Sequence, residues 1–184
     1  YTDKSVLDSL NIKINKNESI AFVGESGSGK TTLLNVLSGL VPLNEGKFLI
    51  DGYESSEIDL RTLQNRIGYI TQEPVIFNAS IFENISFWAP KTPENIERCR
   101  IAAERASLTS FILNQELRED AILGNNGINL SGGQRQRISI ARELYKEIDI
   151  LIMDEATSAL DSETEKTIQE SIESLKGKYT IIAV

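Results

Sequence analysis

The sequence predicts an α/β fold with a mainly parallel sheet, an N-terminal antiparallel β subdomain and an inserted α-helical subdomain. Residues 19–23 form a short apolar run that leads through a glycine-rich loop into leucines at helical spacing, which is typical of a strand, loop and helix in succession. A strand is also expected at 149–153, where four apolar residues follow Asp149 without interruption, as in a sheet that is covered on both faces. Between these strands, the residues from Asn78 to about Leu117 have helical character.

Length and composition indicate one globular domain. The chain has 184 residues, of which 40% are hydrophobic and 25% are charged. The 19 basic and 27 acidic residues give a net charge of −8, so a nucleic-acid-binding surface is not expected. Cys99 is the only cysteine, which excludes an internal disulfide and fits a reducing compartment. We expect its thiol to be packed in the core. No run of residues approaches the roughly 20 apolar positions that span a bilayer.

The N-terminal third carries strand and turn signals. Leu10, Ile12 and Ile14 alternate with polar residues, which predicts a half-buried strand. Residues 44–46 resemble a hairpin turn that leads into a strand at 47–50, closed by an Asp-Gly pair. We therefore expect an antiparallel β portion in this part of the chain.

Further along, helix-start signals become frequent. Asp59 can cap a short helix, and the strand expected at 67–70 delivers Gln72 at its carboxyl end. Residues 92–94 combine a capping threonine, a proline at the first helical position and an acid in the first turn. A second short helix is expected around residues 111–113.

The segment GESGSGKTT at residues 24–32 fits the phosphate-loop pattern G-x-x-x-x-G-K-[ST]. Its glycines let the backbone turn tightly, so that successive N–H groups and a helix N-terminus converge on an anion. Lys30 would reach the β- and γ-phosphates, and the Thr31 hydroxyl would bind Mg²⁺. A simple glycine and serine turn also fits these residues, but the flanking strand and helix favour nucleotide binding. The residues expected at the phosphates are Gly24, Ser26, Gly27, Ser28, Gly29, Lys30, Thr31 and Thr32.

A second possible anion site is the LSGGQ segment at residues 130–134. Ser131 and Gln134 have the spacing of a capping box, so a plain helix start explains them. Gly132 and Gly133, however, are costly in a first helical turn and leave bare N–H groups for a ligand. The adjacent glycines therefore favour an anion site at this helix start.

Two carboxylates, Asp154 and Glu155, follow the apolar strand at 149–153. Capping of a turn is the ordinary role for such acids, but the carboxyl ends of parallel strands are also where α/β folds bind ligands. A helix is then expected from Ser162, and residues 179–184 have the composition of one more strand.

Taken together, these motifs resemble the nucleotide-binding domain of an ATP-binding cassette (ABC) transporter along nearly the whole chain. The resemblance implies a P-loop NTPase (RecA-like) core. Residues 24–32 are similar to the Walker A loop, 130–134 to the signature and 150–155 to Walker B. Gln72 resembles the Q-loop glutamine, and 158–161 the D-loop with Asp161. Tyr1 stands where the family has an adenine-stacking aromatic residue.

The exporter branch is the most similar one, because residues 76–85 and the DEATSALD run at 154–161 have its usual form. Two departures stand out. Asn125 and Asn126 replace a Glu-Arg pair, and the chain contains no histidine where the family has a switch histidine after its last strand. We therefore expect residues 1–184 to be a single nucleotide-binding domain truncated at its C-terminus, with a helical subdomain at about 76–128.

The resemblance implies ATP hydrolysis by a head-to-tail dimer at the cytoplasmic face of the cell membrane. The Walker A loop of one copy and the segment from Ser131 to Gln134 of the other would enclose each ATP. Asp154, with Thr31 and Gln72, would hold Mg²⁺, and Glu155 would orient the attacking water. Lys30, Gln72 and Ser131 would assist catalysis, Asp161 would bridge the two sites, and the helical subdomain would contact a transmembrane domain, fused or separate.

Two other functions fit parts of the pattern. A soluble ABC-type ATPase acting on DNA or ribosomes shares the motifs, but the single cassette, the short spacing between Thr32 and Ser131 and the acidic total disfavour it. The second is a nucleotide-binding partner whose site does not hydrolyse ATP. The other catalytic positions are intact, so the missing histidine is the only feature that supports this alternative.

Overall fold

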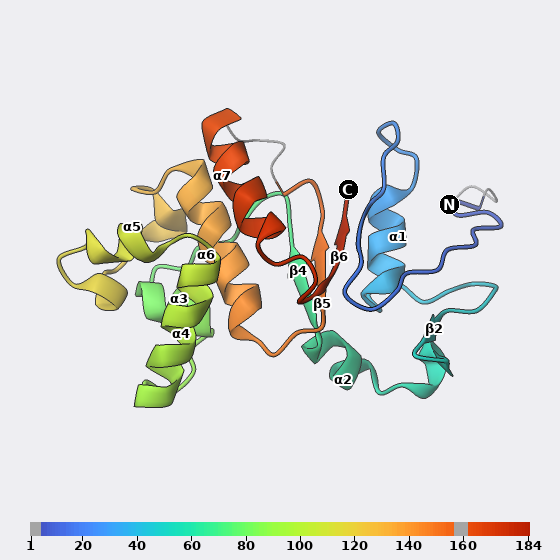
Figure 1. Cartoon of the computed structure of the whole chain (residues 1–184), viewed down its shortest axis with the longest axis horizontal. Coiled ribbons are helices and arrows are strands. Elements are labelled where there is room, and N and C mark those ends of the chain that lie inside the picture. Colours follow the sequence, from blue (N-terminus) through green and yellow to red (C-terminus); the bar gives the residue numbers. More distant parts are fainter. Residues whose placement is uncertain (1–4, 157–161) are drawn as a thin grey trace.

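A parallel sheet of four strands lies at the centre of the computed structural model, which describes residues 5–156 and 162–184. The strand order is β1-β6-β5-β4, and each neighbouring pair is parallel (Figure 1). The strands are β1 (Ser19–Ala21), β4 (Ile67–Ile70), β5 (Ile150–Met153) and β6 (Thr180–Ala183). The expected α/β fold with a mainly parallel sheet is confirmed.

A second, small sheet is antiparallel and consists of β2 (Leu49–Ile50) and β3 (Tyr53–Glu54). Asp51 and Gly52 join them with φ angles of 51° and 88°, the left-handed conformation that tight hairpin turns require. The strand expected around Leu10, Ile12 and Ile14 does not form. The first two side chains are 51% and 44% exposed. Alternation supplies the side-chain pattern of a strand, but within residues 5–156 and 162–184 no partner strand pairs with this segment.

Helices cover both faces of the parallel sheet. On one face, α1 (Lys30–Leu37) and α2 (Leu60–Asn65) contribute Leu34 and Leu63 to a cluster with Ile152 of β5. On the other face, the adjacent Leu151 of β5 packs in a larger cluster with α6 (Gly132–Tyr145) and α7 (Ser162–Glu173). Successive residues of a strand point to opposite faces, so burial on both sides explains the unbroken apolar run in β5.

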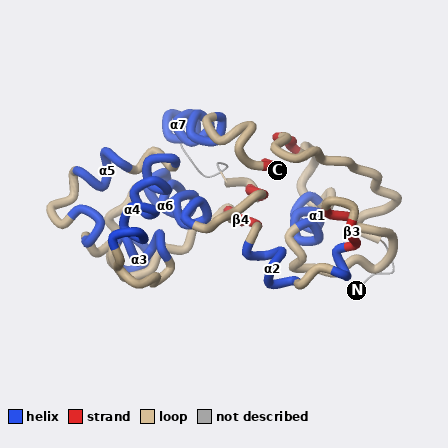
Figure 2. The backbone as a smooth tube through the Cα atoms, turned by 60° about the horizontal axis from the view of Figure 1, so that its bottom comes forward, coloured by secondary structure: helices blue, strands red, loops and turns tan. Residues whose placement is uncertain are grey.

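The helical region comprises α3, α4, α5 and α6, which gather at one end of the molecule (Figure 2). Its first three helices are α3 (Ile81–Ser86), α4 (Pro93–Arg105) and α5 (Thr109–Leu113), and 3₁₀ turns follow at Arg118–Asp120 and Asn125–Gly127. Ser80 forms a capping box with Glu83 at the start of α3. Thr92 caps α4, as its sequence indicates.

A buried cation fixes α6 against α3. The Nε atom of Arg142 donates to the Asn84 carbonyl at 2.7 Å, and its guanidinium lies 5.2 Å from the centre of the Phe77 ring. Burial lowers the pKa of Arg142, and the neighbouring Glu143 opposes this shift. The Asn84 amide in turn bonds to the Phe77 backbone at both ends, with distances of 2.8 and 3.0 Å. Hydrogen bonds thus compensate the burial of this charge.

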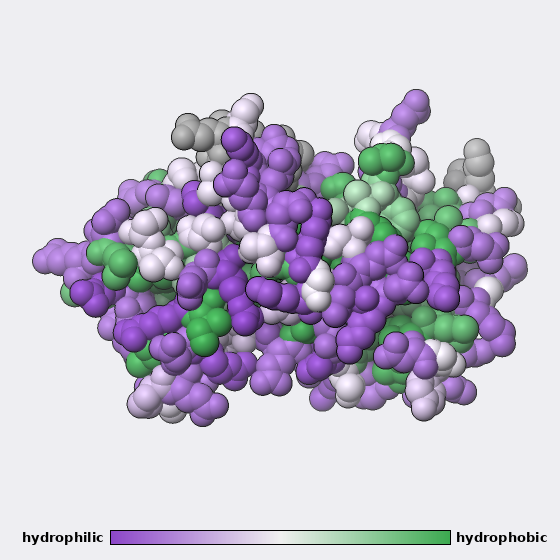
Figure 3. All heavy atoms as spheres, in the orientation of Figure 1, coloured by the Kyte–Doolittle hydropathy of each residue, from purple (hydrophilic) through white to green (hydrophobic). Residues whose placement is uncertain are grey.

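The surface is mixed in character, with hydrophobic side chains gathered on the side that carries α1 and β2 (Figure 3). Large exposed hydrophobic residues from this N-terminal part include Val6, Val23, Leu40, Val41, Leu49 and Tyr53. In residues 5–156 and 162–184, every helix is too short or too polar to cross a lipid bilayer.

Candidate functional site

The glycine-rich loop lies between β1 and α1, as its sequence predicts. Gly27 and Gly29 have φ angles of 80° and 92°, a left-handed conformation that costs little only for glycine. The N–H of Ser28 donates to the Glu25 carbonyl at 3.2 Å, which closes the turn. The spacing of glycines in this segment is therefore what the observed backbone requires.

Helix α1 begins at this loop with an open N-terminus. Gly29 occupies the cap position and supplies no side-chain acceptor, and the first turn holds no acidic residue. The first-turn N–H groups are therefore available to an anion at the positive end of the helix. The Nζ atom of Lys30 folds back over the loop and donates to the carbonyls of Gly24 and Glu25 at 2.8 and 2.9 Å.

Asp154 brings the strand-end carboxylates next to this helix start. The Thr31 hydroxyl donates to Asp154 Oδ1 at 3.2 Å, although the two residues are far apart in the sequence. The Asp154 N–H donates to the Ile70 carbonyl at 2.9 Å, which fixes the residue between the ends of β5 and β4. A hydroxyl and a carboxylate oxygen are the kind of ligands that Mg²⁺ prefers, so this pair fits the metal predicted from the sequence.

Tyr69 belongs to the same cluster, and sequence reasoning missed it. Its hydroxyl oxygen lies 3.3 Å from Asp154 Oδ2 and 3.3 Å from Asn35 Oδ1. Burial raises the pKa of Tyr69 to about 12, and the charge and hydrogen bond of Asp154 act in the same direction. The available signal was a tyrosine near the end of β4, the strand that pairs with β5.

Glu155 and Gln72 lie at the same edge of the sheet. Glu155 follows Asp154, and its N–H donates to the Val184 carbonyl at 3.3 Å. Its φ of 47° is unusual for a residue with a side chain, and such conformations cluster at functional sites. Gln72 follows β4 by two residues, and Gln136 of α6 donates to the preceding Thr71 carbonyl at 3.4 Å. Gln72 and Glu155 therefore lie just beyond the carboxyl ends of β4 and β5, which are neighbours in the sheet.

The second predicted anion site is the start of α6. Ser131 caps the helix, since its hydroxyl accepts from the Gln134 N–H at 3.2 Å and its own N–H donates to Gln134 Oε1 at 2.9 Å. The capping box is thus confirmed, with Gly132 and Gly133 in the first turn. Helices α1 and α6 lie on opposite sides of the sheet (Figures 1 and 2). Within one chain, the glycine-rich loop and the start of α6 therefore do not form a single site.

Two predicted site residues, Tyr1 and Asp161, lie outside the described residues, as does the rest of segment 157–161. Their assignments stay predictions.

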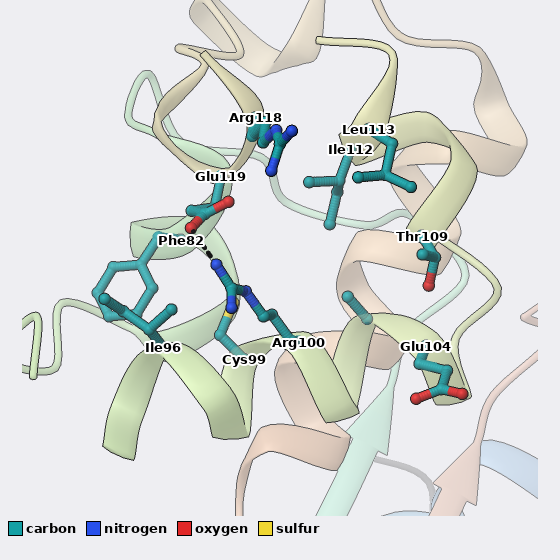
Figure 4. A pocket seen from close by; sticks show the side chains of 11 residues that line it. Phe82, Ile96, Cys99, Arg100, Glu104, Thr109, Ile112, Leu113, Arg118 and Glu119 are labelled. Atoms are coloured by element: carbon teal, nitrogen blue, oxygen red, sulfur yellow. Dashed lines mark hydrogen bonds and ion pairs between the residues drawn. The ribbon is translucent and has the colours of Figure 1, made fainter. Parts of the chain in front are cut away.

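A cavity of about 440 Å³ lies in the helical region, and none of the predicted site residues that the structure describes lines it (Figure 4). Phe82, Ile96 and Cys99 form part of its apolar wall. The Arg100 guanidinium donates to Glu119 at 3.2 Å beside it. None of the predicted phosphate or metal ligands lines this cavity, so it is separate from the phosphate-loop site.

Cys99 provides a pH-dependent test of this packing. Its side chain is 2% exposed, and burial raises the pKa of the thiol to about 12. Only the thiolate is alkylated, so a raised pKa leaves less reactive thiolate at any given pH. We expect alkylation of Cys99 by iodoacetamide, followed by peptide mass spectrometry, to be slow at neutral pH and to accelerate steadily through about pH 10. Urea-unfolded protein is the control. A rate that levels off near the ordinary thiol pKa of about 8.5 would contradict this description.

Comparison with known proteins places this geometry in context. A sequence profile described as "ABC transporter" matches residues 7–158. The chain is 41% identical over 182 residues to an ATP-dependent lipid A-core flippase of Cupriavidus pinatubonensis, covering 97% of the chain and 31% of that protein. It is 45% identical over 186 residues to the protein of that name in Pseudomonas aeruginosa, covering 98% and 30% respectively.

Among solved structures, a bacterial Atm1-family ABC exporter with ATP bound superimposes with a TM-score of 0.84 and 33% sequence identity. The match covers 98% of this chain and 31% of the exporter chain. The chain thus spans about a third of the length of the proteins it matches.

Proposed function

The chain belongs to the ABC transporter family, and on that premise we propose that it binds and hydrolyses ATP to power export across a membrane. The observation that carries the proposal is the contact of the Thr31 hydroxyl with Asp154 at 3.2 Å. This contact joins the glycine-rich loop to the carboxylates at the end of β5. Such an arrangement brings anion-binding N–H groups next to metal-binding oxygens, as a magnesium nucleotide needs.

The loop residues bind the phosphates. The residues from Gly24 to Thr32 surround the triphosphate with backbone N–H groups and the open end of α1. Lys30 exchanges its two carbonyl acceptors, Gly24 and Glu25, for the β- and γ-phosphates. Because the acceptors that it leaves are neutral and the phosphates are charged, the exchange favours the bound state.

Asp154, Thr31 and Gln72 would hold Mg²⁺. When bound, the metal neutralises charge that develops on the phosphates. Glu155 orients and polarises the water that attacks the γ-phosphate, the role that phosphoryl transfer requires of a residue beside the nucleotide. Its position directly after Asp154, with its N–H tied to Val184, supports this assignment.

Two copies complete each site in a head-to-tail dimer. Ser131, Gly132, Gly133 and Gln134 of one copy contact the ATP held by the loop of the other, Asp161 bridges the two sites, and Tyr1 stacks on adenine. The separation of α1 and α6 within one chain supports this composite site (Figure 1). The α6 start adds a second set of N–H donors on the far side of the nucleotide, so ATP becomes part of the interface.

Residues 1–184 then form one nucleotide-binding domain, with the helical subdomain at about 76–128 facing a transmembrane domain at the cytoplasmic face of the cell membrane. Since the matched proteins are about three times as long as this chain, fusion to that domain is supported. The names of the flippase relatives favour an amphipathic lipid as the cargo of the whole protein. These relatives favour export over action on nucleic acid or ribosomes.

Complementation between two inactive chains tests the composite site. In the intact protein, Lys30→Ala spoils the loop and Ser131→Ala spoils the α6 start. A mixed dimer of the two variants has one site with both defects and one with neither, if sites form between copies. We therefore expect the mixed dimer, purified through two different affinity tags, to retain ATP through gel filtration, while neither parent does.

The matched control is a mixed dimer of wild type and the Lys30→Ala/Ser131→Ala double variant. Every composite site in it carries one defect, so it should retain less ATP than the mixture of single variants. If each site instead lies within one chain, the order reverses, because the wild-type copy keeps a complete site. A reversal would therefore contradict the head-to-tail dimer.

A further inference from the structure

We infer that Tyr69 is a positioning residue that holds the Asp154 carboxylate in the orientation that Mg²⁺ binding needs. The inference rests on the proposed function and adds to it a residue that the motifs do not contain. Tyr69 lies inside β4, and its hydroxyl reaches across to the residue that follows β5.

Both oxygens of Asp154 have a hydroxyl neighbour. Thr31 contacts Oδ1 at 3.2 Å from α1, and Tyr69 contacts Oδ2 at 3.3 Å from β4. A carboxylate only accepts hydrogen bonds, so both hydroxyl groups must donate. Two donors on different oxygens fix the rotation of the carboxylate, whereas one donor leaves it free to turn.

The hydrogen atoms can be assigned consistently. The Tyr69 hydroxyl has one hydrogen, yet oxygen atoms of both Asp154 and Asn35 lie 3.3 Å away. The oxygen and nitrogen of an asparagine amide are assigned by their hydrogen bonds, and turning the Asn35 amide makes it a donor to the tyrosine oxygen. The single hydroxyl hydrogen is then directed at Asp154. Asn35 lies four residues after Thr31, so both reach the cluster from one side of α1.

The support behind Tyr69 is rigid. Its N–H donates to Glu143 Oε2 of α6 at 3.2 Å, and its strand pairs with β5 on the other side. The ring packs in the cluster that contains Leu34 and Ile152. Because the packing leaves the Tyr69 side chain little freedom to move, its hydroxyl stays at a fixed position beside the Asp154 carboxylate.

Hydrogen bonds that neighbouring groups donate to a metal ligand hold that ligand in its orientation, and their loss commonly lowers metal affinity about 10-fold or more. After Tyr69→Phe the ring still fills its place, but Asp154 keeps one donor of two. The carboxylate then gains freedom to rotate away from the Thr31 hydroxyl. We expect the affinity for the metal to fall while the binding of metal-free nucleotide is unchanged.

A purely structural role predicts a different result. The hydroxyl also links β4 to α1 through Asn35, and such a link would contribute to stability alone. Both Tyr69→Phe and Asn35→Ala would then lower Tm and leave the magnesium requirement unchanged. Metal affinity, measured apart from turnover, separates the two roles.

The experiment compares Tyr69→Phe with wild type in the intact protein. ADP binding is measured by calorimetry at increasing Mg²⁺, and Mn²⁺ binding is followed by electron paramagnetic resonance. We expect the Mg²⁺ concentration at half effect to rise about 10-fold for Tyr69→Phe. Tyr145→Phe is the matched control, since it removes another buried tyrosine hydroxyl, one without a hydrogen-bond partner among the described residues. Its metal affinity should equal that of wild type.

An unchanged Mg²⁺ and Mn²⁺ affinity in Tyr69→Phe would overturn the inference, whether or not its Tm falls. Asn35→Ala provides a second variant, which removes the other neighbour of the Tyr69 hydroxyl but keeps that hydroxyl beside Asp154, and it should shift the metal affinity less than Tyr69→Phe does. If Asp154→Asn failed to weaken metal binding, the metal assignment in the proposed function would be wrong, and the role of Tyr69 would fall with it. Loss of the Tyr69 effect alone leaves the proposed function in place.

Discussion

Replacing Lys30 with alanine is expected to abolish nucleotide binding, or to lower ATP hydrolysis about 10²–10³-fold where binding survives. The ammonium group lies on the loop, 2.8 and 2.9 Å from two carbonyls, so it is already placed beside the expected phosphates. No other side chain of the loop carries a positive charge. Isothermal titration with ATP and a phosphate-release assay on the intact protein measure the two effects.

Two comparisons separate charge from folding in this experiment. Lys16→Ala removes an exposed lysine from the turn before β1, and it should leave both measurements unchanged. The Tm of Lys30→Ala shows whether loss of the bonds to Gly24 and Glu25 loosens the loop itself. If Lys30→Ala bound ATP as tightly as wild type and turned it over at the same rate, the loop would not be the phosphate site.

Local signals in the sequence were sufficient for most of the fold. The caps at Asp59, Thr92 and Ser131 each depend on residues within three positions, so the pattern that predicts the helix start is also the contact that forms it. The hydrophobic composition of β4 and β5 likewise predicts from local sequence alone that these strands are buried, as the structure shows. The strand expected near Ile12 failed because a strand needs a partner elsewhere in the chain, which alternation does not specify.

The site divides in the same way. The loop and the carboxylates were found from motifs, and their meeting followed from the rule that parallel strands end at one edge. The sequence places Tyr69 near the end of an expected strand but does not show its role, because that role depends on the register of β4 against β5 and on the side of the sheet that the residue faces. The burial of Arg142 on Asn84 was hidden for a similar reason, since a charged residue in a helix usually faces water.

Glu155→Gln is expected to separate binding from hydrolysis. The amide has the size and shape of the carboxylate, so the backbone at φ 47° and the N–H bond to Val184 can persist. It carries no negative charge to orient and polarise the water, however, and we expect turnover to fall about 10²–10⁴-fold, the range typical for loss of a positioned acid or base. ATP should still bind, because Lys30, Thr31 and Asp154 are unchanged. The dimer that closes on ATP should then accumulate, since hydrolysis no longer opens it.

Size-exclusion chromatography with and without Mg²⁺ and ATP measures closure of the intact protein, and phosphate release measures turnover. Glu147→Gln is the matched control, because it makes the same change at an exposed acid between α6 and β5 and should alter neither reading. Equal turnover in Glu155→Gln and wild type would remove Glu155 from its proposed role. Loss of ATP binding in the variant would also contradict it, because an acid that only orients water is not needed to hold the nucleotide. Retained binding with collapsed turnover is the one combination that assigns Glu155 to the chemical step.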